Sequence, residues 1–458
     1  MHPRATLWAT IFGSSVAFID GSVVNVALPA LEADLKVDPA DLSWAINAYL
    51  LPLGALILLG GALGDHFGRR RFFQIGLATF TVASAVCAAA PSLRWLLAAR
   101  AFQGLGAALL LPNSLALLGS EFTGEARGRA IGTWAAAGAF AGALGPIIGG
   151  WMVDIVGWRM IFLLNVPIAA GAGFLTRKYV AERRQLHGAA PLDGIGAVLV
   201  TAALALLTWA LTQASEAAGA QPASWSAALA GAVLLSAFLW HEGKLGDRAV
   251  MPFAMFSSAT FVGLTLLTFF LYASLGGLLV LLPFFLIKIE RWPAVAAGAS
   301  LLPVPVLIAL GSRFMGQVAS RRGARLPLTI GSGLVGVGLA LYARVPARDV
   351  SYWLDIFPPT LLVALGMGAC VAPLTTSVLS SVNANHVGLA SGFNSAVARI
   401  ASLIVTALLG FVFARQESAA NFMSGFHAAA WIGAGSAALA AGFALYLINP
   451  QDPKAAPA

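Results

Sequence analysis

Residues 7–30 read LWATIFGSSVAFIDGSVVNVALPA, and Asp20 is the only charged residue in this stretch. An apolar run of about 20 residues is long enough to cross the bilayer core as an α-helix with its backbone hydrogen bonds satisfied internally. Apolar runs of similar length recur along the whole chain. We therefore predict an all-α integral membrane protein. The predicted spans are residues 7–30, 42–63, 72–91, 94–118, 130–153, 158–176, 192–213, 225–241, 259–287, 294–312, 326–343, 354–378, 387–413 and 425–448.

The composition also indicates a membrane protein. Of the 458 residues, 59% are hydrophobic and only 10% are charged, whereas a soluble globular protein has about 25% charged residues. This excludes a water-soluble enzyme and a disordered chain. The net charge of +8 then belongs to loops at a membrane surface, so lipids rather than nucleic acid are the expected contact. Cys87 and Cys370 lie inside apolar runs and give neither a disulfide framework nor metal-ligand spacing.

Basic residues predict the orientation of the chain in the membrane. If both termini lie on one side, most of the 27 Lys and Arg fall in the loops and tails of that side. Loops rich in Lys and Arg stay in the cytoplasm. Both termini are therefore predicted to be cytoplasmic.

Two polar breaks divide the chain into three parts. A basic stretch from Arg177 to His187 follows the sixth apolar run, and residues 241–248 follow the eighth. The predicted domains are a six-helix bundle at 1–185, an inserted two-helix hairpin at 186–245 and a second six-helix bundle at 246–458. This organisation has fourteen transmembrane helices, and the alternative has twelve, with something other than a hairpin at residues 192–241.

The two six-helix halves resemble each other in one loop. Residues 64–71 read GDHFGRRR after the second run, and residues 320–325 read SRRGAR after the tenth. A glycine followed by a basic residue occupies matching places in both loops, and Ser320 stands where Asp65 does. Two six-helix repeats around a central path are the architecture of a transporter.

Ionisable residues at membrane depth are costly and are therefore candidates for function. Three stand out: Asp20, Arg100 and Arg399. At 1.5 Å per residue, Asp20 lies roughly 14 Å and Arg100 roughly 9 Å below the same outer surface. A long arginine side chain can bridge that difference. Asp20 is then either a carboxylate that takes up protons or half of a structural ion pair with Arg100, and both readings stay open.

Glycines in the fifth run form one helical face. Steps of 4, 3 and 4 residues align them, so another helix can approach closely there, and a proline within the series permits a bend. The face is read either as a hinge or sliding seam, or as plain close packing. The glycines of this face are Gly138, Gly142, Gly145 and Gly149, and the predicted seam also includes Pro146 and Gly150.

The loop after the second run has a mechanical interpretation. The carboxylate of Asp65 can accept hydrogen bonds from neighbouring helix ends or arginines, and Arg69 to Arg71 can meet anionic lipid or a carboxylate. Such contacts would latch one conformation. The alternative is that these arginines only follow the positive-inside rule, which we favour for Arg71.

Taken in order, these motifs resemble the major facilitator superfamily, and within it the fourteen-helix drug:proton antiporters. The stretches that carry the resemblance are Asp20–Pro29, Gly61–Arg70, Arg100–Gly106, Gly145–Gly150, Trp158–Pro167 and Ala390–Arg399. The resemblance covers nearly the whole chain. It implies a multi-pass protein of the bacterial cytoplasmic membrane that is driven by the proton gradient without a cofactor.

The resemblance also implies roles for particular residues. Asp20 and Arg100 are assigned to proton coupling, and the glycines of the fifth run to the seam between the halves. The inter-helix latch is assigned to Gly61, Asp65, Gly68, Arg69 and Arg70. One departure is that residues 294–312 contain no Asp or Glu, where many relatives carry a further acidic residue. Asp154 and Asp355 are read as solvated caps at the outer ends of spans, so export of multivalent cations is not expected.

The predicted function is proton-coupled export of small, largely apolar, neutral or monocationic compounds by alternating access. The protein is expected to act as a monomer and not as an enzyme, because the chain has no Walker-type loop, G-x-S-x-G elbow or H-E-x-x-H pair. The alternatives are an exporter dedicated to one metabolite or lipid, and a transporter-like membrane sensor. The expected cavity residues are Asn25, Tyr49, Gln103, Asn113, Phe140, Asn394 and Arg399.

Overall fold

The computed structural model describes nearly the whole chain as helices. The described residues are 3–38, 41–122, 124–182, 193–216, 222–246, 253–347, 349–382, 387–413 and 419–449. Within these ranges every regular element is helical and none is a β-strand.

The helices follow the predicted apolar runs closely. The interrupted runs have a helix on each side of a short break, as with α11 and α12, where Pro303 and Pro305 open the second helix. In chain order the elements are α1 (Pro3–Leu35), α2 (Leu42–Phe67), α3 (Arg69–Ala88), α4 (Leu93–Glu121), α5 (Gly124–Ile155), α6 (Arg159–Leu163), α7 (Asn165–Tyr179), α8 (Gly194–Glu216), α9 (Pro222–Leu245), η3 (Phe253–Ser257), α10 (Ala259–Lys288), α11 (Ala294–Ala299), α12 (Pro303–Arg322), α13 (Arg325–Tyr342), η4 (Tyr352–Ile356), α14 (Phe357–Ser380), α15 (Val387–Leu408), α16 (Gly410–Phe413) and α17 (Ala419–Leu447).

Within the described part of the chain, twelve helical segments are long and apolar enough to cross a membrane. Two further helices, α2 and α5, contain the shorter apolar windows Leu42–Ile57 and Phe140–Ile155. The segments of α8 and α9 are among the twelve, so the region for which a hairpin was only one possibility does contain two long helices. The count of fourteen spans stays a prediction.

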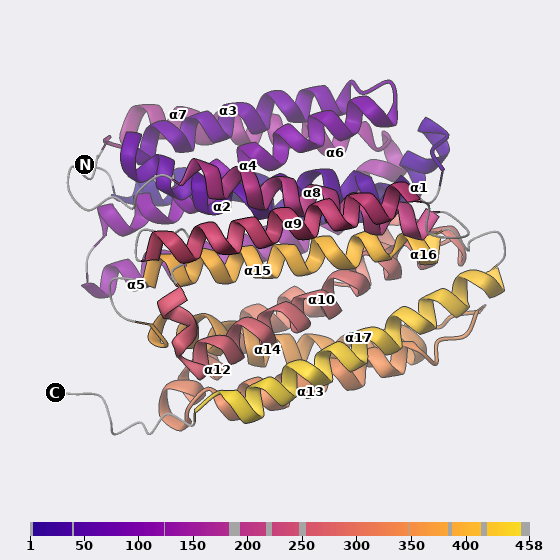
Figure 1. The fold of residues 1–458 in the computed structure, drawn as a ribbon. Helices are drawn as coiled ribbons and strands as arrows, with labels where there is room; N and C mark the ends of the chain where they lie inside the picture. The colour runs from indigo at the N-terminus through magenta and orange to yellow at the C-terminus, as the bar shows by residue number, and fades with distance from the viewer. Residues whose placement is uncertain are drawn as a thin grey trace.

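The helices lie roughly side by side in one layered bundle, with most of α1–α7 in its upper part, most of α10–α17 in its lower part, and α5 and α15 at the level where these parts meet (Figure 1). The two parts meet where α1 packs on α10, α2 on α15, and α5 on α11 and α12. Helices α8 and α9 pack on each other, and α8 also contacts α2 and α15. The inserted pair therefore covers the α2–α15 seam.

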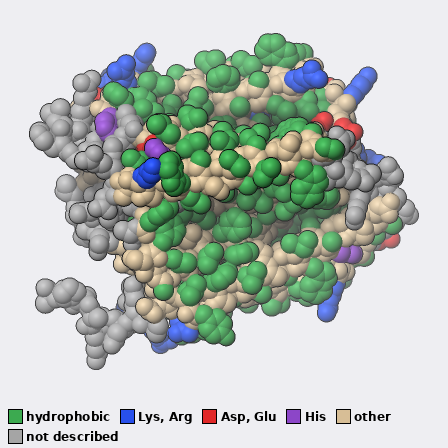
Figure 2. All heavy atoms as spheres, viewed as in Figure 1, with side chains coloured by type: hydrophobic (Ala, Val, Ile, Leu, Met, Phe, Trp, Pro, Cys, Tyr) green, Lys and Arg blue, Asp and Glu red, His purple; other side chains and the backbone are tan. Residues whose placement is uncertain are grey.

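The surface has the pattern of a protein that lies across a bilayer. Figure 2 shows apolar side chains spread over the middle of this face and Lys and Arg gathered toward its two ends. The first turn of α1 and the last turn of α17 lie at the same end of the bundle (Figure 1). That end is called the termini end below, and the other is called the far end.

The two matching loops have the same backbone feature. Gly68 between α2 and α3 has φ 114°, and Gly323 between α12 and α13 has φ 83°. Only glycine adopts such angles without strain, so each glycine allows a tight turn between consecutive helices. This agrees with an internal repeat. The side chains of Asp65 and Ser320 lie outside the described residues.

The glycine face of α5 packs mainly against α1. A Cβ added at Gly138 would stand 2.6 Å from the ring of Phe18, one at Gly145 would stand 3.0 Å from the Ile19 carbonyl, and one at Gly149 would overlap Val23. Along most of its length the face is therefore a close contact inside the first half, and its role as a moving seam between the halves stays a prediction.

Only the last part of the α5 glycine series reaches the second half. A Cβ on Gly150 would overlap the backbone of Ala294 in α11, and a Cβ on Gly298 would overlap the Pro146 carbonyl. The backbones of α5 and α11 are thus in direct contact at the far end of the bundle.

We predict that Gly145→Leu destabilises the protein by about 1–3 kcal/mol, the usual range for overpacking. The added side chain must push α5 away from α1. Thermal unfolding of the purified protein in detergent measures the effect. Gly171→Leu on α7 is the matched control, because a Cβ there meets nothing within 4 Å. Equal unfolding midpoints for the two variants would contradict the close α1–α5 packing.

Candidate functional site

A buried ion pair lies in the middle of the first half. Asp20 on α1 and Arg100 on α4 have relative side-chain exposures of 0% and 1%, and Arg100 Nη1 donates a hydrogen bond to Asp20 Oδ2. The pairing expected from their depths is therefore present in the structure. A charge this deeply buried is retained only when its partner and hydrogen bonds compensate for lost hydration.

The guanidinium of Arg100 is held on several sides. Its Nε donates to the Ala45 carbonyl of α2 at 3.0 Å. Its planar group lies over the ring of Tyr49, with 4.5 Å to the ring centroid, and over Phe162 at 5.8 Å. Arginine suits this place because it stays charged and combines a rigid fork of donors with stacking on aromatic faces. Lysine could reproduce the charge but not these contacts.

The second carboxylate oxygen of Asp20 accepts two further hydrogen bonds. Gln103 Nε2 donates to Oδ1 at 3.2 Å, and Asn165 Nδ2 donates to the same atom at 3.1 Å. Gln103 also donates to Ser84 Oγ at 2.8 Å and accepts from Arg100 Nη1 at 3.0 Å. Every partner of Asp20 is a donor, so the network is arranged around an ionised carboxylate.

Ser84 and Asn165 were missed in the sequence as members of this site. Asn165 belongs to the Trp158–Pro167 stretch, but an amide in an apolar run has many possible partners. Ser84 is one of many small polar residues on α3. Neither carries a charge, so neither is marked by the cost of burial that singled out Asp20 and Arg100.

A cavity of about 320 Å³ lies between the two halves. Its walls come from α1, α2, α10, α14 and α15, and it follows the last turns of α14. It is lined by Phe18, Leu50, Tyr272, Thr375, Val378, Leu379, Asn394, Ser395, Ala398, Arg399 and Ser402. The expected cavity residues Asn394 and Arg399 are therefore in its wall. Tyr49, whose hydroxyl donates to the Ala17 carbonyl at 3.1 Å, has Asp20, Arg100 and Arg399 as its electrostatic neighbours.

The other expected cavity residues do not line this cavity. Gln103 is part of the buried network, and Asn25 is 7% exposed within α1. Asn113 donates to the Gly60 and Leu109 carbonyls at 2.9 and 2.7 Å, so it joins α4 to α2. Phe140 is 62% exposed on α5. The sequence could place these residues on helices, but it could not give the direction in which each side chain points.

The residues expected to form a latch make their described contacts within the first half. Arg69 Nη1 donates to the Ala116 carbonyl at 3.2 Å, and Arg70 Nη2 donates to the Arg177 carbonyl at 2.8 Å. Glu182 accepts from the backbone amides of Arg70 and Arg71 at 3.2 and 3.0 Å, which places a carboxylate at the start of α3. Sequence reasoning did not identify Glu182 as a partner of this loop.

The glycines of the same loop have steric roles. A Cβ added at Gly61 would stand 3.4 Å from Pro112 of α4, and a side chain on Gly68 would meet the Glu182 carboxylate. The described contacts thus tie α2 and α3 to α4 and to the segment after α7. Whether these contacts between helices latch one conformation, as the sequence predicts, stays a prediction.

At the far end, the two halves are joined by polar contacts. Asp154 at the end of α5 accepts hydrogen bonds from the backbone amides of Ala294 and Val295 at 3.1 and 3.0 Å. Lys288 of α10 pairs with Glu32 of α1 at 2.7 Å. Asp154 is an exposed cap, as expected, but the helix that it caps belongs to the other half. Asp355, by contrast, caps its own segment by accepting from the Ser351 amide at 2.8 Å.

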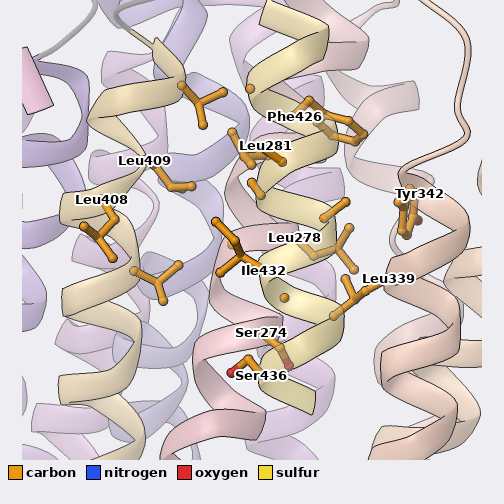
Figure 3. A pocket seen from close by; sticks show the side chains of 18 of the residues that line it. Ser274, Leu278, Leu281, Leu339, Tyr342, Leu408, Leu409, Phe426, Ile432 and Ser436 are labelled. Atoms are coloured by element: carbon orange, nitrogen blue, oxygen red, sulfur yellow. The ribbon is translucent and has the colours of Figure 1, made fainter. Parts of the chain in front are cut away.

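A second cavity, of about 360 Å³, lies wholly within the second half, between α10, α13 and α15–α17 (Figure 3). Its walls are apolar apart from a few hydroxyl groups. Ser274 donates to the Leu271 carbonyl and Ser436 to the Phe270 carbonyl, both at 2.7 Å. This cavity has no charged residue in its wall, so it has less to offer a polar ligand than the cavity between the halves.

The sequence profile of the Major Facilitator Superfamily matches residues 10–406. The chain belongs to this superfamily. In the described part of the chain, no group of three His, Cys, Asp or Glu side chains is placed to hold a metal. The protein is a membrane transporter of the superfamily and not an enzyme, and transporters of this type need no cofactor.

Several relatives are drug or antibiotic resistance proteins. The multidrug resistance protein Stp of Mycobacterium tuberculosis is 32% identical over 90% of this chain and 76% of its own length. The methylenomycin A resistance protein of Bacillus subtilis is 31% identical, covering 87% and 85%. The tetracenomycin C resistance and export protein of Streptomyces glaucescens is 31% identical, covering 91% and 77%.

Solved structures of other transporters share the fold. A D-xylose–proton symporter superposes with a TM-score of 0.67 over 98% of both chains at 16% identity. The POT family transporter PepTSo gives a TM-score of 0.67 over 97% of both chains, also at 16% identity. At this identity the likeness shows the fold of this chain and nothing of its substrate.

We predict that Arg100→Ala destabilises the protein by about 3–5 kcal/mol, because it leaves the buried carboxylate of Asp20 unpaired. Arg100→Ala combined with Asp20→Asn should recover part of that loss, since no uncompensated charge remains. Thermal unfolding of the two single variants, the double variant and the wild type gives the coupling. Strictly additive effects would contradict an energetically coupled pair.

Proposed function

We propose that this transporter is a proton-coupled antiporter that exports small, largely apolar compounds by alternating access. The observation that carries the proposal is the fully buried Asp20 carboxylate with its arginine and amide partners. The names of the relatives support export, since three of them denote resistance to a drug or antibiotic. The test is efflux from liposomes that contain the purified protein and an imposed pH gradient.

The proposal includes the membrane organisation. Fourteen spans follow if α2 and α5 also cross the membrane, and their packing along α4 and α1 supports this. The proposed parts are then the bundles 1–185 and 246–458 with the hairpin 186–245 between them. We place the protein in a bacterial cytoplasmic membrane as a monomer, with both termini in the cytoplasm, because the basic residues favour that orientation.

Proton coupling is assigned to Asp20 and Arg100. A proton on Asp20 removes the negative charge that Arg100 Nη1 binds. It also turns one carboxylate oxygen into a hydrogen-bond donor, and this donor would face further donors, because Arg100, Gln103 and Asn165 all donate to this carboxylate. Uptake of a proton therefore requires the network to rearrange. Because the partners come from several helices, such a rearrangement can be passed on to the packing of the first half.

The structure has features of a state that is closed at the far end. Asp154 binds the start of α11, Glu32 pairs with Lys288, and α5 and α11 meet at their glycines. The cavity between the halves follows the last turns of α14, toward the termini end. With cytoplasmic termini, this is the state that receives substrate from the cytoplasm. Opening the far end must break each of these contacts.

One central carboxylate implies about one proton per cycle and limits the charge of the substrate. A pH difference of one unit supplies about 1.36 kcal/mol, and a potential of 100 mV supplies about 2.3 kcal/mol for each net charge moved inward. A neutral substrate that leaves as one proton enters uses both terms, whereas a monocation uses only the pH term. A dication would move one net charge outward against the potential. The proposed substrate is therefore neutral or singly charged.

A second candidate function is export of one dedicated compound. Two relatives are named for a single antibiotic, methylenomycin A or tetracenomycin C. Both candidates use the same site and the same energy source. Efflux measured against a panel of chemically unrelated compounds separates them, because a dedicated exporter moves only one chemical class.

We predict that Asp20→Asn abolishes proton-driven efflux but retains substrate binding. Asparagine has similar size and can still accept hydrogen bonds, but it does not take up a proton at this position. Efflux of the neutral dye N-phenylnaphthylamine from proteoliposomes measures transport, and dye binding is measured without a gradient. Asp355→Asn is the control because Asp355 caps only its own segment. Undiminished efflux by Asp20→Asn would remove this residue from the coupling mechanism.

We predict that Asp154→Ala opens the far end. The variant loses two hydrogen bonds between the halves, each worth about 0.5–1.5 kcal/mol. The ratio of closed to open molecules should therefore fall about 5- to 150-fold. Spin labels on Lys36→Cys and Arg291→Cys, one in each half, report the separation. Cys87 and Cys370 are buried and should not take up label. Asp355→Ala is the matched control, and an unchanged distance distribution in Asp154→Ala would argue against this latch.

A further inference from the structure

We propose that Arg399 in the cavity between the halves binds an anionic group, a carboxylate, on an otherwise apolar substrate. This inference rests on the proposed function and adds the substrate class to it. Among singly charged substrates, it selects anions over cations.

The first observation is the state of the arginine itself. Arg399 lines the cavity from α15, and its Nε is buried without a hydrogen-bond partner. A Cβ on Gly54 of α2 would stand 3.6 Å from the Cβ of Arg399, so the two halves pack closely at the base of this side chain. A guanidinium has five N–H donors and no acceptor. The guanidinium of Arg399 therefore needs hydrogen-bond acceptors, and its surroundings provide none for Nε.

The second observation is the charge around it. Among the described residues, no carboxylate lies within ion-pair distance of Arg399, and its electrostatic neighbours are the phenols of Tyr49 and Tyr272. The carboxylate of Asp20 is already bound by Arg100, Gln103 and Asn165. No Asp or Glu is among the residues that line the cavity. The wall thus carries one positive charge that is not neutralised by the described residues.

The rest of the wall fits an apolar molecule with one acidic end. Phe18, Leu50 and Val378 give apolar surface, and the volume of about 320 Å³ is at the small end of the range for ligand sites. The side-chain amide of Asn394 lies 2.6 Å from Thr268 Oγ1. That hydroxyl forms one hydrogen bond with the amide, so at least one N–H of Asn394 is left to donate. An anionic oxygen would meet donors from Asn394 and Arg399 and apolar contacts from the other side chains.

A carboxylate suits the arginine better than other groups do. The two oxygens of a carboxylate match two parallel N–H donors of a guanidinium, and such bidentate pairs are strong and directional. A monocation would be repelled by the same charge. When one anion leaves and one proton enters, the net effect is that two positive charges move inward. The membrane potential and the pH gradient therefore both favour this exchange.

The test compares two probes that differ only at the acidic group, naphthoate and its amide naphthamide. Binding to the purified full-length protein in nanodiscs is measured by calorimetry at neutral pH without any gradient. We expect naphthoate to bind the wild type more tightly than naphthamide. Arg399→Gln should weaken naphthoate binding about 10- to 100-fold, the range for a hydrogen bond to a charged group, and should leave naphthamide binding unchanged.

Two further variants make the result specific. Arg399→Lys keeps the charge but loses the planar donors, so it should bind naphthoate with an affinity between those of wild type and Arg399→Gln. If Arg399→Gln does not fold, Arg399→Lys decides the question by the same comparison. Arg321→Gln removes an exposed arginine at the end of α12 and should change neither affinity.

Several results would overturn the proposal. They are no naphthoate binding by the wild type, equal affinities for naphthoate and naphthamide, or an unchanged affinity for naphthoate in Arg399→Gln or, where that variant does not fold, in Arg399→Lys. Failure of the proposed function is a separate result. Naphthoate binding without any proton-driven efflux would refute antiport and keep the anion site. Proton-driven efflux of a neutral dye, without a preference for naphthoate over naphthamide in binding, would refute the anion site and keep antiport.

Discussion

The buried pair of Asp20 and Arg100 is the contact on which the first half is organised. The side chains and carbonyl groups around it come from α1, α2, α3, α4 and α7, so one charged pair brings five helices to one point. Between membrane helices there is little hydrophobic driving force, and packing and hydrogen bonds hold them together. A small group of polar residues therefore has a large effect on how these helices are arranged.

Stability alone is a weak reason to keep such a pair. Taking two charges out of water costs several kcal/mol for each ion, and apolar replacements of similar volume are often equally stable. The desolvation cost of the pair is easier to understand if the pair has a function, such as the proposed proton coupling. Tyr49 strengthens that view because its ring lies under Arg100 while its phenol is also an electrostatic neighbour of Arg399. Arg100 of the proposed proton site and Arg399 of the cavity thus share Tyr49 as a neighbour.

Much of the fold could be predicted from the sequence because lipid limits the choices. Apolar runs gave the helices, and the depths of Asp20 and Arg100 predicted that they meet. The remaining contacts depend on which way each helix face and side chain points, and no single residue type reveals that direction. The glycine face of α5 was recognisable, but not that its neighbour would be α1. The partners of Asp154 are backbone amides, which every residue except proline possesses, so the sequence contains no mark of that contact.

The inserted pair of helices makes the two seams between the halves unequal. Helix α8 lies along α2 and α15, whereas the α5 seam is formed directly with α11 and α12. A compound dissolved in the bilayer could reach the interior sideways only where two helices separate and nothing covers the gap. Helix α8 covers the opening between α2 and α15 from the lipid. A lipid-soluble compound therefore has one lateral route of entry fewer than it would have in two bundles without the inserted pair.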